Sequence, residues 1–183
     1  GKNLIAYNVI LKYVRSFIDH EIRESEKHQI KILGLEKKMT IDVSYPEVGF
    51  PVKLTGKLDR IDEIDGILRI IDYKSGKVLP SQVAIFDWAL LTEDYKYSKA
   101  FQLLCYALMY TENKPVNQLE AGIISFKNLS AGLLSFGIKE SEKSRSKPNK
   151  SITQETLSQF STELKRLVLE ICNPNVPFNE KEV

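Results

Sequence analysis

The sequence feature that most constrains this chain is residues 70–76, which read Ile-Ile-Asp-Tyr-Lys-Ser-Gly. The short apolar run carries an acid, Asp72, and a lysine, Lys74, follows two residues later. Because side chains alternate between the faces of a β-strand, Asp72 and Lys74 project from one face, roughly 6–7 Å apart, and Tyr73 projects from the other. Gly76 suits a sharp turn at the strand end. Alone, this pattern fits either a surface ion pair or a metal ligand beside a residue that handles an attacking water.

The segment just before this stretch supplies a second acid. Residues 54–62 have the pattern of a strand, and the Asp-Gly pair at 65–66 indicates a tight turn between two antiparallel strands. This pairing places Asp59 close to level with Asp72, so that two carboxylates and Lys74 converge on one patch. Mg²⁺ needs only one or two carboxylates in addition to waters and a substrate phosphate. The hairpin therefore predicts a magnesium site.

Three motifs in order make the chain resemble the PD-(D/E)XK nucleases, and especially their RecB/AddB-like branch. They are Gly-Lys-Leu-Asp-Arg-Ile-Asp at 56–62, Ile-Asp-Tyr-Lys-Ser-Gly at 71–76, and Gln-Leu-Leu-Cys-Tyr at 102–106, which resembles a Gln-x-x-x-Tyr helix motif. The resemblance implies an α/β restriction-endonuclease-like core, with a central mixed β-sheet flanked by helices. It also implies a set of catalytic residues: Asp59, Asp72, Lys74, Gln102 and Tyr106.

The resemblance further implies a Mg²⁺-dependent DNA nuclease, and we expect an exonuclease of DNA end resection and recombinational repair. Asp59, Asp72 and the backbone carbonyl of Tyr73 are the expected ligands of Mg²⁺, for which Mn²⁺ can substitute. Gln102 and Tyr106 lie one helical turn apart on one face, where we expect them to orient Lys74. The expected partners are single-stranded DNA ends and a helicase domain or subunit. The alternative is a catalytically inert nuclease-fold module that binds DNA or another protein.

The family's first motif has no clear counterpart here. Many relatives place a metal-binding His on the first helix as Gly-x-x-x-His, but Ser16 stands four residues before His20. We therefore expect His20, Glu21 and Glu24 to lie on a solvated helix face. We also expect residues 1–183 to form a single nuclease-like domain of a larger helicase–nuclease-type protein, with the first motif lying upstream.

Hydrophobic periodicity and turn residues predict the remaining elements. We expect helices at 3–25 and 98–111, the latter capped by Ser98, strands at 35–48, 52–63, 67–74, 119–126 and 133–138, and loop structure at 78–97. A last helix begins near Ser151 or Thr153, with Ser151-x-x-Gln154 fitting a capping box, and ends at 173–174. The polar segment 141–151 is either a solvated loop or an arm that contacts phosphates.

Composition agrees with a globular protein and limits the other classes of function. Hydrophobic residues make up 43% and charged residues 27% of the chain, and no apolar run approaches the ~20 residues of a membrane span. The net charge of +2 neither indicates nor excludes nucleic-acid binding. Cys105 and Cys172 lack C-x-x-C spacing, so neither a disulfide framework nor a zinc site is indicated, and the iron–sulfur cluster of some relatives is not supported. We expect a cytoplasmic, reducing setting.

Overall fold

A computed structural model describes residues 2–112, 114 and 118–178 of the chain. Its main elements are α1 (Lys2–Ser25), β1 (Ile30–Val43), β2 (Val52–Ile64), β3 (Ile67–Lys74), α3 (Ser98–Thr111), β5 (Leu119–Ser125), β6 (Leu133–Ser135) and α4 (Gln154–Ile171). Shorter elements lie between them: β4 (Ala84–Ile85), α2 (Leu90–Glu93), β7 (Gly137–Ile138), and 3₁₀ turns at Pro80–Gln82, Tyr95–Tyr97 and Phe126–Ala131.

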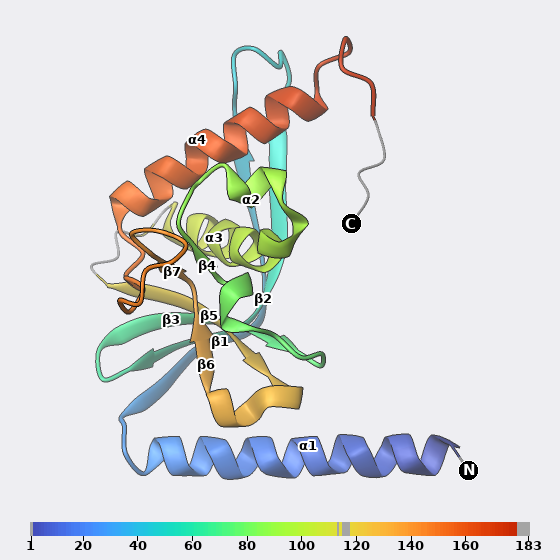
Figure 1. Cartoon of the computed structure of the whole chain (residues 1–183), viewed down its shortest axis with the longest axis vertical. Coiled ribbons are helices and arrows are strands. Elements are labelled where there is room, and N and C mark those ends of the chain that lie inside the picture. Colours follow the sequence, from blue (N-terminus) through green and yellow to red (C-terminus); the bar gives the residue numbers. More distant parts are fainter. Residues whose placement is uncertain (1, 113, 115–117, 179–183) are drawn as a thin grey trace.

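The five main strands form one mixed sheet. Its strand order is β1-β2-β3-β5-β6, in which β3 and β5 run parallel and the other neighbours run antiparallel. Helix α1 lies along one side of this sheet, whereas α2, α3 and α4 lie on the other (Figure 1). The predicted α/β architecture, a central mixed sheet flanked by helices, is confirmed.

The core lies between the sheet and α3, which carries small or apolar residues wherever it faces the strands. Leu58 and Ile70 on the strands and Leu103 and Leu104 on α3 are fully buried. Helix α4 completes this layer, because Phe160 packs edge-on against Phe101 with ring centroids 5.3 Å apart. The helix that carries two of the predicted site residues is therefore held rigidly over β2 and β3.

The tight turn between β2 and β3 sets the register of the two strands that carry the predicted acids. Asp65 and Gly66 both have positive φ angles, +50° and +85°, as a two-residue hairpin turn requires. The Asp65 carboxylate accepts a hydrogen bond from the Gln29 backbone N–H at 2.9 Å and lies 2.6 Å from Nδ1 of His28. The Gln29 hydrogen bond, and after it the His28 contact, lower the pKa of Asp65. This turn is thus tied to the chain that enters β1.

Two predicted strands differ from the structure. The first strand was predicted at 35–48 but runs from Ile30 to Val43, because the chain turns at Pro46, where Val48 N–H donates to the Tyr45 carbonyl. The single strand predicted at 133–138 is two strands. β6 belongs to the main sheet and β7 pairs with β4 in a separate ribbon, and the fully buried Phe136 lies between them.

The predicted loop at 78–97 and both predicted caps also need correction. Segment 78–97 contains β4 and α2, with Val83 and Ile85 buried in the core. Ser98 does not cap α3, because the chain enters that helix through a 3₁₀ turn capped by Asp94. The capping box of α4 pairs Thr153 with Thr156 instead of Ser151 with Gln154.

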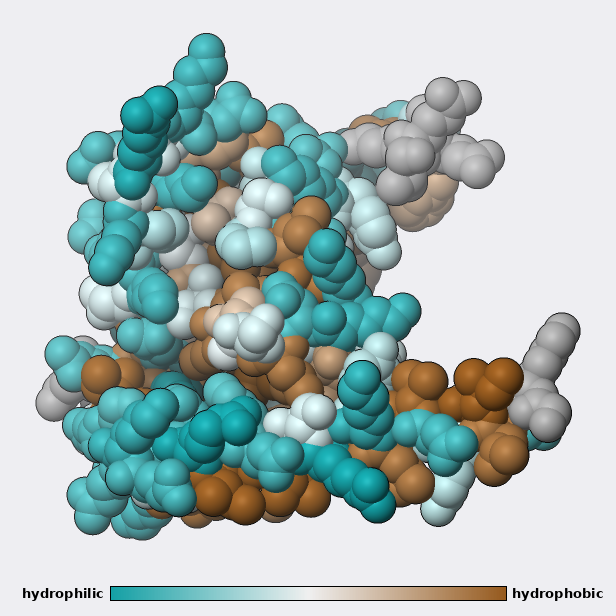
Figure 2. Space-filling view, turned by 60° about the horizontal axis from the view of Figure 1, so that its bottom comes forward, coloured by the Kyte–Doolittle hydropathy of each residue, from teal (hydrophilic) through white to brown (hydrophobic). Residues whose placement is uncertain are grey.

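Helix α1 leaves an apolar stripe uncovered. Figure 2, which brings this side forward, shows apolar side chains along the edge of α1 that faces away from the sheet and at its free end. Eight large apolar residues of the helix are 42–67% exposed: Leu4, Ile5, Tyr7, Val9, Ile10, Val14, Ile18 and Ile22. No helix in the described part of the chain is long and apolar enough to cross a bilayer.

Candidate active site

Four of the predicted site residues form one continuous series of contacts on the α3 side of the sheet. Lys74 Nζ lies 2.9 Å from Asp72 Oδ2 and donates a hydrogen bond to Gln102 Oε1 at 3.0 Å. Gln102 Nε2 in turn lies 2.7 Å from the Tyr106 hydroxyl. Two residues at the end of β3 and two residues one turn apart on α3 therefore meet, as their spacing predicted.

The fifth predicted residue, Asp59, lies beside this series where β2 separates from β3. The register of the two strands ends at the Arg60–Ile71 pair, and the next pair along would be Asp59 and Asp72. At this position the side chain of Asp59 bonds to the neighbouring strand in place of a backbone carbonyl: Asp59 Oδ2 accepts a hydrogen bond from the Tyr73 N–H at 2.8 Å. The charge of Asp59 helps to raise the pKa of Asp72, so the two carboxylates lie close together.

Asp72 is the most electrostatically unusual group of the site. Burial is the main cause that raises its pKa, Lys74 works in the opposite direction, and Asp59 adds to the increase. The ion pair of Asp72 Oδ2 with Lys74, at 2.9 Å, lacks hydrogen-bond geometry, and this buried oxygen accepts no hydrogen bond from the described residues. A bound cation could therefore still coordinate it.

The donor set at this position fits a hard divalent cation. Two neighbouring carboxylates, one with a buried oxygen that accepts no hydrogen bond, are the ligands that Mg²⁺ takes from a protein when a substrate phosphate and waters supply the rest. No group of three or more His, Cys, Asp or Glu side chains that could hold a metal is found within residues 2–112, 114 and 118–178. A cage made by the protein alone, such as a structural zinc site, is therefore not present in that part of the chain.

Both the hydroxyl and the ring of Tyr106 have defined contacts, the hydroxyl with Gln102 and the ring with Gly56. Burial, and after it the charge of Asp72, raises the pKa of its hydroxyl, which therefore stays protonated at neutral pH. Its ring packs on Gly56 of β2: a Cβ atom at Gly56 would lie 3.0 Å from Tyr106 Cε1 and 2.6 Å from Met109 Cε. The absence of a side chain at Gly56 thus allows α3 to pack closely on β2.

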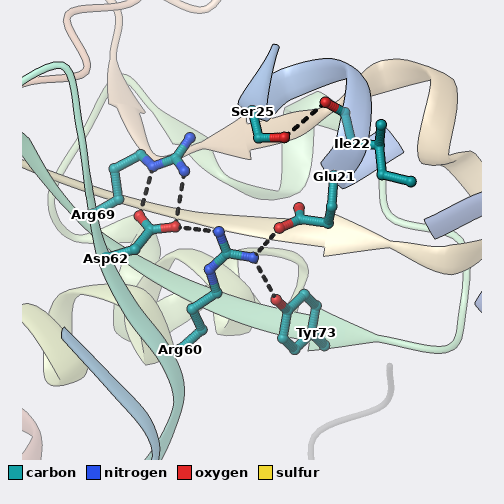
Figure 3. Close-up of polar contacts among 7 residues, drawn as sticks. All are labelled: Glu21, Ile22, Ser25, Arg60, Asp62, Arg69 and Tyr73. Carbon is teal, nitrogen blue, oxygen red and sulfur yellow. Dashed lines mark hydrogen bonds and ion pairs between the residues drawn. The ribbon is translucent and has the colours of Figure 1, made fainter. Parts of the chain in front are cut away.

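The opposite face of the same strands carries a buried ion network (Figure 3). Asp62 accepts two hydrogen bonds from Arg69, at 2.8 and 2.9 Å, and lies 2.6 Å from Arg60 NH2. Arg60 also pairs with Glu21 of α1 and donates to the Tyr73 hydroxyl at 3.3 Å. Asp62 is fully buried and Arg60 is buried beside it, so this network is a structural one within the fold.

The sequence analysis missed two members of that network. Glu21 was expected on a solvated helix face, but it is half-buried and anchors α1 to Arg60. With His20 and Glu24 it lines a cleft of about 570 Å³ between α1 and the sheet. Arg69 was not singled out, although the hairpin register places it directly opposite Asp62. The hairpin register could have identified Arg69 from the sequence. Nothing in the sequence indicated how α1 is oriented, so Glu21 could not be identified in the same way.

A comparison with known families agrees with this arrangement. Residues 5–182 match the sequence model of the PD-(D/E)XK nuclease superfamily. The match spans nearly the whole chain, and the mixed sheet with its flanking helices is consistent with the restriction-endonuclease-like core of that superfamily. A search of curated proteins finds no significant match.

Proposed function

The chain belongs to the PD-(D/E)XK nuclease superfamily, and on that premise we propose that it is a magnesium-dependent deoxyribonuclease of the RecB/AddB-like branch. Membership suggests phosphodiester hydrolysis of a nucleic acid, typically with a divalent metal. We propose further that it is an exonuclease that acts on single-stranded DNA ends during end resection and repair, together with a helicase domain or subunit. The observation that carries the proposal is the contact series from Asp72 through Lys74 and Gln102 to Tyr106.

The proposed metal ligands are the carboxylates of Asp59 and Asp72 and the backbone carbonyl of Tyr73. When bound, Mg²⁺ would polarise a phosphoryl oxygen and lower the pKa of a coordinated water. The buried oxygen of Asp72, which pairs with Lys74 but accepts no hydrogen bond, supports its place in this set. Asp59 has one oxygen committed to the Tyr73 N–H, so its carboxylate is held at a defined position and orientation next to Asp72.

Lys74 is the proposed residue that orients the attacking water and stabilises negative charge on the phosphate. Its ammonium group lies at the edge of the site, with the side chain 32% exposed, so it can reach a substrate. A cation placed in advance where charge develops is the usual source of transition-state stabilisation in such a reaction. The position of Lys74 depends on Gln102, whose carbonyl faces the lysine while its amide faces Tyr106.

The experiment that tests this proposal compares Asp72→Asn with Lys74→Ala. Mn²⁺ affinity is measured by titration calorimetry, and cleavage is measured on end-labelled single-stranded DNA. Asp72→Asn should abolish both metal binding and cleavage, whereas Lys74→Ala should retain the metal and lose about 10²–10³-fold in turnover. The double variant should lose less than the product of the two single losses, as residues that act as one unit do.

Asp19→Asn on the exposed face of α1 is the matched control and should behave like the unaltered protein. Normal cleavage by Asp72→Asn would refute the proposed site. If the unaltered protein binds neither Mn²⁺ nor Mg²⁺, the inert nuclease-fold module is the correct alternative.

A further inference from the structure

The strongest unexplained feature outside the site is a concave basic surface, which we call the basic cleft. It has a volume of about 710 Å³ and lies between the segment after β3, the edge strand β6 and the loop after β7. Four cations line it, with no acid among the lining residues: Lys139, Arg145, Lys147 and Lys150. Its other lining residues are small or apolar and include Leu79, Pro80 and Leu133.

The positive charge of the whole chain is concentrated in this loop. Residues 139–150 contain five lysines or arginines and two glutamates, a net charge of +3, against +2 for the complete sequence. Within the described residues, none of these five cations lies within 4 Å of an acidic group, although nine such ion pairs occur elsewhere. Unpaired cations in a hollow raise the local concentration of anions.

The loop is also anchored at both ends. Ile138 and Asn149 exchange two backbone hydrogen bonds, each 2.9 Å long, and the Lys139 N–H donates to the Ile85 carbonyl at 2.8 Å. Pro148 packs so closely on Gly137 that a Cβ atom there would lie 2.6 Å from the proline Cβ. The loop that carries the cations is therefore closed at its base by backbone hydrogen bonds and by the packing of Pro148 on Gly137.

The basic cleft lies within reach of the candidate active site. Leu79 follows Lys74 by five residues, so their Cα atoms are at most ~18 Å apart. In the sheet, Asp72 pairs with Ile123 and Ile123 pairs with Leu134, which also lines the cleft, so the cleft wall lies two strand spacings, roughly 10 Å, from Asp72. Lys77, an exposed cation, lies in the segment between them.

We propose that the basic cleft binds the phosphodiester backbone of a single DNA strand whose neighbouring nucleotides occupy the candidate active site. This inference rests on the proposed function, because it extends the substrate of that same site. At the per-strand spacing of a stacked helix, about 3.4 Å per charge, the separation of roughly 10–18 Å corresponds to about three to five nucleotides, and an extended strand would need fewer. The contacts are to phosphates, so binding depends on salt and not on base sequence.

The test compares Arg145→Gln/Lys147→Gln/Lys150→Gln with a control of equal composition, Lys12→Gln/Arg15→Gln/Lys31→Gln. The control residues are exposed and remote from the cleft, on α1 and at the start of β1. Binding of a fluorescein-labelled oligothymidylate is followed by anisotropy in EDTA at several salt concentrations. Melting curves by circular dichroism confirm that both variants are folded.

Each phosphate contact contributes about 0.7 to the slope of log K against log salt, so the cleft variant should have a slope shallower by about 2. Its affinity at about 0.1 M salt should fall about 100-fold, while the control stays near the unaltered protein. Equal losses in the two variants, or an unchanged slope in the cleft variant, would overturn the inference.

The EDTA assay separates this inference from the proposed catalysis. EDTA removes the metal, so this assay measures binding at the cleft without cleavage. Cleavage that depends on Asp72, together with normal binding by the cleft variant, would overturn the cleft and leave the nuclease intact. Binding that depends on Arg145, without any cleavage in Mg²⁺, would support the cleft and overturn the nuclease.

Discussion

Asp62→Asn is expected to be one of the most destabilising single changes in the chain, although it keeps the size of the side chain. The carboxylate is fully buried and accepts hydrogen bonds from Arg69 with both of its oxygens, while Arg60 contacts it from the other side. An asparagine would present an amide N–H₂ to a guanidinium donor and would leave two cations with one fewer negative charge.

The size of this effect follows from the burial of the partners. Burial by itself would lower the pKa of Arg60, but Glu21 and Tyr73 outweigh it and raise the pKa, so the guanidinium stays charged. Arg60 Nε already lacks a hydrogen-bond partner among the described residues. Breaking a buried ion pair costs about 3–5 kcal/mol. In a domain of this length, each kcal/mol lowers Tm by about 2–4 °C, so Tm should fall by about 6–20 °C.

The assay is urea and thermal unfolding followed by circular dichroism. The control is Glu47→Gln, which removes an exposed pair with Lys165 and should leave the stability nearly unchanged. Mn²⁺ affinity should be unchanged wherever Asp62→Asn remains folded, because the network lies on the face opposite Asp72. A loss below about 1 kcal/mol, or full stability with lost metal binding, would refute the structural role of Asp62.

Two further predictions concern the hairpin turn and the α3 face of the site. The pKa of Asp65 is lowered on folding, so its carboxylate stabilises the fold at pH values above its ordinary pKa of 3.8, and this stabilisation is lost as the pH falls through the lowered value. Urea unfolding of the unaltered protein and of Asp65→Asn should therefore show a stability difference at neutral pH that vanishes in strong acid. Gln102→Ala should lower DNA cleavage but keep Mn²⁺ affinity and folding, because it removes the partner of Lys74 and leaves Asp72 in place; a large drop in Tm would instead identify Gln102 as a structural residue.

The β2–β3 hairpin and the shared helix face of Gln102 and Tyr106 were predictable because local spacing determines them. The Asp-Gly turn sets the β2–β3 register, alternation sets which residues share a face, and an i, i+4 pair shares a helix face. These three rules place Asp59 beside Asp72 and Lys74, and they put Gln102 and Tyr106 on one helix face. The contact between the two groups depends on how α3 packs on the sheet, and only the resemblance to the nuclease family indicated it. The roles of these residues in metal binding and catalysis remain predictions.

Features that depend on packing between distant segments were not predictable in the same way. The split of residues 133–138 between two sheets depends on the burial of Phe136 and on the pairing of β7 with β4. The bond between Glu21 and Arg60 depends on how α1 lies against the sheet. Neither contact leaves a periodic pattern in the sequence, because each joins segments whose relative placement is set by the rest of the fold.

The parallel pairing of β3 with β5 has a consequence for how the protein folds. An antiparallel hairpin such as β2–β3 closes a short loop, whereas the β3–β5 pair requires residues 75–118, including all of α3, to be arranged first. Contacts over such separations form slowly. The two carboxylates therefore come together in a local unit, and Gln102 and Tyr106 reach Lys74 only when the crossover docks. We therefore expect the acidic half of the site to form before the half that positions the lysine when the protein refolds.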